Sequence, residues 1–270
     1  MLAEESLRAG KLKESLAQLQ EQIRAEPSNS KYRVFLFQLL AVMGQWERAM
    51  TQLKVLGEMD AGALAMVQAY RDPLQCEGVR AGVFSGDVAP TIFGEPEHWM
   101  ALQMEALKLA AKGHYAQARQ LRDEAFELAP SSSGTVDGKA FEWIADADVR
   151  LGPMLEAILN GRYYWVPFHR IRKIQIEEPV DMRDMVWTPV HFEWANGGEM
   201  VGMIPTRYPG SEASDDAQIL LARKTEWVQR DEETFFGLGQ RMLATNEDEY
   251  PLIDIRSIEL LPADGEEKKD

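Results

Sequence analysis

The first 130 residues carry apolar positions at the spacing of amphipathic helices. Two stripes show this spacing: Leu12, Leu16, Leu19 and Ile23, and then Trp99, Leu102, Ala106 and Leu109. Residues 32–43 are almost continuously apolar, as expected for a helix that packs on two sides. Phe126 and Leu128 supply apolar positions for a helix that follows the second stripe. The pattern predicts a helical front half.

A short motif recurs among these helices. It consists of a glycine, a large residue two positions later and a small residue three positions after that, and it begins at Gly10, Gly44 and Gly113. Gly10 and Gly44 are 34 positions apart, the period of tetratricopeptide repeats, and 69 positions separate Gly44 from Gly113. Glycine ends a helix readily because it adopts the left-handed cap conformation. We therefore predict tetratricopeptide-like helix pairs over residues 1–135.

The segment between the second and third motifs departs from the repeat. Residues 62–70 read as a helix, and Asp72-Pro73 is expected to end it. Residues 78–96 are rich in glycine and proline, which favours a loop or a short-helix insertion. Such an insertion is either a plain connector or the wall of a groove.

A run of small residues at 131–138 is the best candidate for a domain boundary. It divides the chain into a repeat domain, residues 1–135, and a second domain, residues 136–270. We expect the second domain to begin with two short helices, at residues 139–151 and 154–159. Asn160-Gly161 would cap the second of these helices.

Asp148 falls on the apolar face of the first of these predicted helices. That face is formed by Phe141, Ile144 and Leu151. A buried carboxylate needs a partner. We expect Asp148 to be a buried structural residue that pairs with an arginine, Arg162 or Arg170, or with several backbone N–H groups.

After residue 161 the apolar pattern changes to a period of two, which is typical of strands. Strands are predicted at residues 163–167, 170–176, 186–194, 200–204, 218–222, 225–229, 235–243 and 253–260. Asn196-Gly197 predicts a hairpin between the third and fourth strands. Residues 262–270 read as a charged tail. The fold class predicted is α+β, with helical repeats followed by a mostly antiparallel β domain.

The charge is uneven along the chain. The net charge is −15, and residues 1–130 carry 14 Lys and Arg against 17 Asp and Glu, whereas residues 131–270 carry 15 against 27. This field argues against nucleic acid and membrane surfaces as partners and would attract a basic partner to the back half. No apolar run is long enough to span a membrane, and the N-terminus does not resemble a signal peptide. The single cysteine, Cys76, reads as a small core residue.

A search for catalytic chemistry finds no complete constellation. None of the four histidines has neighbours at a convincing metal-ligand spacing. His191-Phe-Glu193 matches only the first half of the zinc-deaminase signature, and Gly237-Leu-Gly239 lacks the third glycine of a dinucleotide motif. We therefore predict a protein that is not an enzyme, with no catalytic residue, no metal site and no cofactor.

Two surfaces are candidates for binding a partner protein. One is the concave face of the helical repeats, where such arrays hold peptides. The other combines aromatic and basic residues: Tyr163, Tyr164, Trp165, Phe168, Arg170, Arg172 and Lys173. Aromatic residues and arginine are the usual hot-spot types at interfaces. The alternatives are that the aromatic residues form the core between the two halves and that the basic residues form a solvated strand edge.

Two stretches of the back half resemble the ImpE/TagJ family. They are the run Phe141-Glu-Trp-Ile-Ala-Asp-Ala-Asp-Val-Arg-Leu-Gly-Pro153 and the run Asn160-Gly-Arg-Tyr-Tyr-Trp-Val-Pro-Phe168 with Arg170-Ile171. Arg183-Asp-Met-Val-Trp187 and Ile204-Pro-x-x-Tyr208-Pro-Gly-Ser211 also fit, and the likeness extends over nearly the whole chain.

The resemblance implies a cytoplasmic adaptor of bacterial type VI secretion. Its implied partners are the small subunit of the contractile sheath and the AAA+ ATPase ClpV, with no catalytic activity and no cofactor. We expect the adaptor to grip a short, helical segment of the sheath subunit in an apolar groove. Two other functions stay open: a chaperone-like regulator of sheath subunits before assembly, and an enzyme whose pocket holds His191, Glu193 and an arginine.

Overall fold

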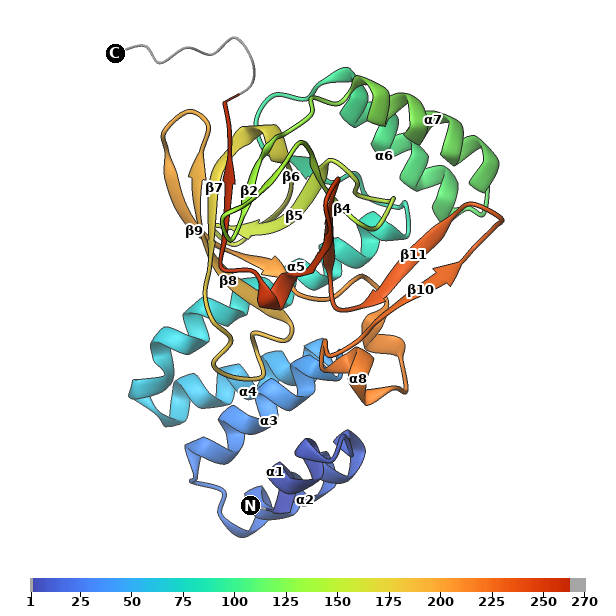
Figure 1. Cartoon of the computed structure of the whole chain (residues 1–270). Coiled ribbons are helices and arrows are strands. Elements are labelled where there is room, and N and C mark those ends of the chain that lie inside the picture. Colours follow the sequence, from blue (N-terminus) through green and yellow to red (C-terminus); the bar gives the residue numbers. More distant parts are fainter. Residues whose placement is uncertain (1, 263–270) are drawn as a thin grey trace.

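The computed structural model describes residues 2–262 and has the predicted α+β fold, with helices in front and a mostly antiparallel β region behind (Figure 1). Helices α1–α4 lie below the sheets in Figure 1, and α6 and α7 lie beside their upper end. Apart from Pro262, the predicted charged tail lies outside the described residues.

The front half consists largely of helix pairs. Its helices are α1 (Leu2–Arg8), α2 (Leu12–Ala25), α3 (Ser30–Val42), α4 (Trp46–Met59), a 3-10 turn (Ala61–Ala63), α5 (Leu64–Phe84), α6 (His98–Ala111) and α7 (Tyr115–Leu128). Gly10, Gly44 and Gly113 lie in the turns of the pairs α1–α2, α3–α4 and α6–α7, with φ of +75°, +66° and +80°. The predicted glycine caps are therefore confirmed.

Helix α5 corrects the expectation for the middle of the front half. It continues through Asp72-Pro73 to Phe84, so the first part of the predicted insertion, residues 78–84, is helical. A proline inside a helix costs about 3 kcal/mol, because it removes one hydrogen bond and crowds the preceding turn. Here Pro73 is buried beside Leu74 and Cys76, and α5 packs against the sheet. The apolar surface that α5 buries against the sheet offsets the free-energy cost of the proline. The remainder of the insertion contains a two-residue strand, β1 (Thr91–Ile92).

The back half is built from three sheets. Its strands are β2 (Gly134–Val136), β3 (Lys139–Phe141), β4 (Ile144–Asp146), β5 (Met154–Leu159), β6 (Arg162–Pro167), β7 (Ile171–Ile176), β8 (Trp187–Trp194), β9 (Glu199–Pro205), β10 (Thr225–Gln229), β11 (Phe235–Gly239), β12 (Met242–Thr245), β13 (Glu249–Pro251) and β14 (Ser257–Leu260). The largest sheet has the order β1-β6-β5-β9-β8-β7-β14-β2-β3, and only the β1–β6 pair is parallel. The two smaller sheets are β13-β12-β4 and β10-β11.

The prediction of two helices after the linker was wrong. Residues 139–151 form β3, β4 and a turn, and residues 154–159 form strand β5. All six residues of β5 are buried, because both faces of this inner strand are covered. A strand buried on both faces lacks the alternation that would distinguish it from a helix. Asn160-Gly161 is the hairpin turn between β5 and β6, and both residues have positive φ, +47° and +75°.

The prediction of a strand at residues 218–222 was also wrong. These residues form most of a short helix, α8 (Ala217–Leu220), and the turn that follows it. Asp216 starts the helix, since its carboxylate accepts a hydrogen bond from the backbone N–H of Gln218 at 2.8 Å. The hairpin predicted at Asn196-Gly197 is present between β8 and β9.

The hydrophobic core that stabilises the helices also includes residues from the back half. Phe37 and Leu53 of the repeats belong to the same buried cluster as Trp165, Trp187 and Leu220. A second cluster lies among the strands themselves, around Phe192 and Ile258. Cys76 is a buried free thiol in the first cluster, as predicted. The domain boundary near residue 135 stays a prediction.

Candidate functional site

The predicted aromatic patch lies mostly inside the protein. The side chains of Tyr163, Trp165 and Phe168 are buried, and Tyr164 is half-buried against Phe93. The Trp165 indole donates a hydrogen bond to the Tyr163 hydroxyl at 2.8 Å. Tyr163 and Trp165 belong to the core cluster shared by the two halves. A partner could not reach these two rings without opening that core.

The basic residues next to them already have partners within the chain. Arg170 donates to the backbone carbonyls of Phe93 and Glu95 and pairs with the Glu97 carboxylate at 2.7 Å. Arg172 donates to the carbonyl of Leu260, and Lys173 lies 2.9 Å from the Glu259 carboxylate. Arg172 is the most exposed of the three cations. Partner binding by this patch stays a prediction.

Asp148 is fully buried, in a turn rather than on a helix. Its arginine partner is Arg150, not Arg162 or Arg170, with N···O distances of 2.5–3.1 Å. The carboxylate also accepts backbone hydrogen bonds from Arg150 at 2.9 Å and from Gly237 at 2.7 Å. Aspartate commonly stabilises turns in this way, because its short side chain reaches the backbone two residues on. Asp148 therefore attaches the turn after β4 to β11.

A buried ion cluster joins α5 to the sheets. We define it as Arg80, Asp146, Glu156 and Arg241, all of which are buried. Both oxygens of the Glu156 carboxylate accept from Arg80, at 2.6 and 3.0 Å. Arg241 donates to Glu156 and to Asp146, and the Tyr163 hydroxyl donates to Glu156 at 2.5 Å. Two arginines thus bridge two carboxylates in the interior of the molecule, and Arg80 also lies 3.4 Å from the buried Glu77 carboxylate.

The cluster shifts the titration of its central carboxylate. Burial by itself would raise the pKa of Glu156, but the nearby Arg80 and Arg241 guanidinium groups outweigh burial and lower that pKa to about 2. Glu156 is therefore ionised at neutral pH. Asp146 also lines a space of about 440 Å³ beside β4. Because the four side chains are buried and bonded to one another, we assign the cluster a structural role.

A further buried arginine connects the repeats to the back half. Arg207 donates to the carbonyls of Val42, the last residue of α3, at 2.7 Å and of Leu220 at 2.6 Å. Carbonyls at the end of a helix lack partners within that helix, and a cation there also interacts favourably with the helix dipole. Burial lowers the pKa of Arg207 to about 10.

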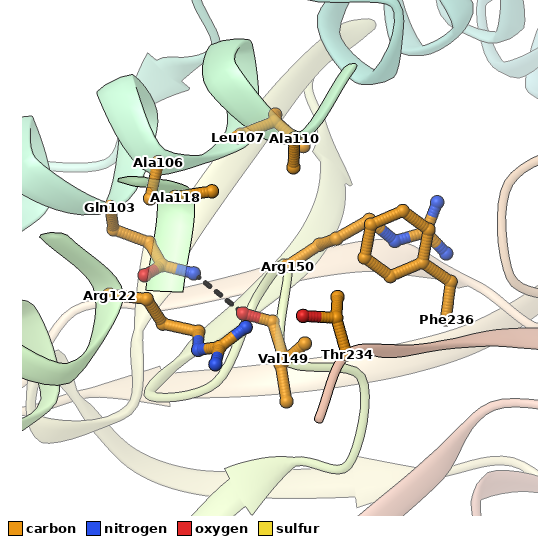
Figure 2. Close-up of a pocket in the computed structure, with 10 residues that line it drawn as sticks. All are labelled: Gln103, Ala106, Leu107, Ala110, Ala118, Arg122, Val149, Arg150, Thr234 and Phe236. Carbon is orange, nitrogen blue, oxygen red and sulfur yellow. Dashed lines mark hydrogen bonds between the residues drawn. The ribbon is translucent and has the colours of Figure 1, made fainter. Parts of the chain in front are cut away.

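The small cavity between α6, α7 and β11 is not a ligand site. Its volume is about 10 Å³, and Figure 2 shows Gln103 pointing across it to donate to the Val149 carbonyl at 3.0 Å. Arg150 lies over the Phe236 ring at 4.4 Å and covers one end (Figure 2). Pockets for small molecules are typically about 300–1,000 Å³, so this cavity is far too small for one.

An open groove of about 650 Å³ lies on the helical repeats. It is lined by Glu4, Leu7 and Arg8 of α1, by Lys31, Val34, Phe35 and Gln38 of α3, by Pro179, Val180, Asp181, Met182 and Met185 of the β7–β8 connection, and by Leu221 and Arg223 after α8. We call this surface the repeat groove. The α1 and α3 residues are three or four positions apart, so each set lies on one face of its helix.

The β7–β8 connection is held in place by its own hydrogen bonds. The Asp184 carboxylate accepts from the backbone N–H groups of Val180 at 2.7 Å and Asp181 at 3.0 Å. Arg183 lies over the Tyr70 ring of α5 at 4.6 Å. Val180 is nevertheless 90% exposed at the edge of the groove. Its exposure is thus a fixed feature of the connection.

A groove between α5 and the β8–β9 hairpin contains the histidine of the enzyme alternative. His191 lines this space of about 440 Å³, but neither Glu193 nor any arginine does. The His191 ring nitrogen lies 3.5 Å from the Glu199 carboxylate on the neighbouring strand. Over residues 2–262 no group of three or more His, Cys, Asp or Glu side chains could hold a metal ion. The arrangement expected of an enzyme pocket is not assembled here.

Comparisons with known proteins cover nearly the whole chain. A family model described as ImpE protein matches residues 138–259, which lie in the β-rich half. The type VI secretion system accessory component TagJ of Pseudomonas aeruginosa is 48% identical over 265 residues, which are 98% of this chain and 93% of that protein. This chain belongs to the ImpE/TagJ family.

A solved structure has the same fold as this member of the family. The crystal structure of protein VPA1032 from Vibrio parahaemolyticus is similar with a TM-score of 0.88 and 25% sequence identity, over 97% of this chain and 98% of that one. The likeness therefore includes the helical front as well as the sheets. Among residues 2–262, none of the helices has both the length and the apolar character needed to cross a membrane.

Proposed function

We propose that this protein is a non-enzymatic adaptor of type VI secretion that binds a short helical segment of the small sheath subunit in the repeat groove. The proposal rests on family membership for the secretion system and on the repeat groove for the mode of binding. The sheath subunit and ClpV are the partners that the family resemblance implies. The groove is the observation that carries the binding step.

The shape and chemistry of the groove suit a helix better than a small ligand. Its floor is apolar, formed by Leu7, Val34, Phe35, Met182 and Met185, which are all half-buried. Amphipathic helices bind such grooves through apolar side chains at positions i, i+3, i+4 and i+7. Methionine adapts its shape to different contacts, which helps it pack against a partner helix. Because the β7–β8 connection is already fixed, little ordering is needed on binding.

The link to ClpV uses the rest of the surface. Most of the negative charge of the chain belongs to residues 131–270. A negative field of this size attracts a positively charged surface and speeds encounter with it. In this proposal the back half faces the ATPase while the repeats hold the sheath subunit.

The direct test is a calorimetric titration of the whole chain with peptides from the N-terminal part of the small sheath subunit and with the intact sheath heterodimer. We expect one peptide to bind and Val180→Asp to weaken it at least about tenfold, because a charge would enter the apolar contact. Val201→Asp is the matched control, since Val201 is also exposed, at 73%, but lines the groove beside His191.

Three results would contradict the proposal or relocate the site. No binding by any peptide or by the heterodimer removes it. Loss of binding in Val201→Asp but not in Val180→Asp moves the site to the hairpin groove. Binding to free subunits but not to contracted sheath assigns the protein to the chaperone-like role before assembly.

A further inference from the structure

Among residues 2–262, three cations of the repeat groove have no ion-pair or hydrogen-bond partner. Arg8, Lys31 and Arg223 line it and are exposed, and within residues 2–262 none of their side chains forms an ion pair or a hydrogen bond. They come from three separate parts of the chain, α1, α3 and the segment after α8. The fold thus gathers unpaired positive charge around an apolar floor, in a chain whose net charge is −15.

Neighbouring cations outside this groove are paired. Lys224, the residue next to Arg223, lies 2.5 Å from Glu226 and 3.4 Å from Asp216. On α2, Lys11 lies 3.3 Å from Glu14 and Lys13 lies 3.0 Å from Asp215. Exposed cations without an ion pair among the described residues also occur elsewhere, at Lys54, Arg71 and Lys112. What distinguishes the repeat groove is that three such cations lie around one apolar floor.

The carboxylates of the groove wall do not neutralise these cations. Asp181 is paired with Arg183, and Glu4 has an interaction of its own. A partner that binds the apolar floor brings its flanking residues within reach of Arg8, Lys31 and Arg223. Carboxylates at those positions would gain ion pairs, whereas lysine or arginine would meet like charges.

Building on the proposed function, we infer that the segment bound in the repeat groove is an acidic amphipathic helix, whose apolar face contacts the floor and whose carboxylates pair with Arg8, Lys31 and Arg223. The three cations act as specificity determinants, because exposed ion pairs set partner choice and orientation more than they raise affinity. The groove would thus prefer an acidic partner, whereas the strongly acidic back half would attract a basic one.

A pair of synthetic helical peptides tests the inference independently of the natural partner. Both carry leucine at i, i+3, i+4 and i+7, and the remaining positions are rich in glutamate in one peptide and in lysine in the other. Fluorescence anisotropy with the whole chain should show tighter binding of the acidic peptide by roughly tenfold at low salt. The difference should shrink as salt is added, because exposed charges are screened.

Reversing the charge of the groove cations tests whether they cause the preference for the acidic peptide. The triple variant Arg8→Glu, Lys31→Glu and Arg223→Glu should lose the preference for the acidic peptide. The control triple variant Lys54→Glu, Arg71→Glu and Lys112→Glu changes the net charge equally at exposed positions outside the groove, and should keep the preference. Circular dichroism checks that both variants are folded.

The outcomes separate this inference from the proposed function. Equal binding of the two peptides, no binding of either, or equal loss in both triple variants overturns the inference. If the sheath subunit binds the wild type and the groove variant alike, the inference fails and the adaptor role stands. If the acidic peptide is preferred but no sheath subunit binds, the charge preference stands and the proposed partner is wrong.

Discussion

The buried ion cluster and the repeat groove use the same residue type in opposite ways. In the cluster, Arg80 and Arg241 are buried, and each is paired with a buried carboxylate. In the groove, Arg8 and Arg223 are exposed and have no ion-pair partner in the described part of the chain. A buried charge must be paired to be tolerated, whereas an exposed one costs little when it stays free. Pairing therefore distinguishes arginines that build this fold from arginines available to a partner.

The largest expected effect comes from neutralising the centre of the cluster. Glu156→Gln should lower the free energy of unfolding by about 3–5 kcal/mol, because it leaves Arg80 and Arg241 buried without their shared counter-charge. Urea unfolding measures the change. The control is Glu105→Gln, which removes an exposed pair with Lys108 and should cost less than about 1 kcal/mol. Equal midpoints for the two variants would refute the structural role of the cluster.

Acid should weaken the cluster over a defined pH range. The pKa of Glu156 is lowered from its ordinary value of 4.5 to about 2, so its contribution to stability is complete above about 4.5. As the pH falls from there towards 2, the unfolded chain takes up the proton first and the contribution is lost. We expect urea midpoints at about pH 5, 4 and 3 to fall more steeply for the wild type than for Glu156→Gln. Parallel slopes would argue against the lowered pKa.

The smallest expected changes in the free energy of unfolding come from replacing two arginines. Arg207 is bonded within the fold, whereas Arg223 lines the groove. Arg207→Met should lower the free energy of unfolding by about 2–3 kcal/mol, because the carbonyls of Val42 and Leu220 lose a charged donor. Arg223→Met should change it by less than about 0.5 kcal/mol, because that side chain has no internal partner. Thermal or urea unfolding of the two variants side by side gives the comparison. A large loss in Arg223→Met would mean that the groove arginine is structural.

The parts of the fold with a clear period were predictable from the sequence. The glycine motifs at Gly10, Gly44 and Gly113 predicted three helix pairs. The change of period after residue 161 predicted strands β6–β11 and β14, whereas β1–β5 and β13 were not predicted. Strand β5 was missed because a strand buried on both faces has no alternation. The turn around Asp148 was missed because its shape depends on a hydrogen bond from Gly237, 89 positions later.

The sites were harder to predict than the elements. The partners in the ion cluster are 76–95 positions apart along the chain, and no local pattern connects them. One signal was available, since Glu156 is the only charged residue in the apolar run of residues 154–159. The repeat groove could be anticipated only as a concave face of helices. Its cations and its exposed Val180 come from segments that only the folded chain brings together.

Arg207 fixes the position of helix α3 relative to the back half of the molecule. One end of α3 carries Lys31 and lines the groove, while the carbonyl of Val42 at the other end accepts a hydrogen bond from the buried Arg207 guanidinium. A helix fixed at one end in this way acts as a rigid strut. A segment bound in the groove would then be held at a constant distance and orientation from the back half. Under the proposed function, the protein would act as a spacer between the sheath subunit and the ATPase, with a length fixed by the fold.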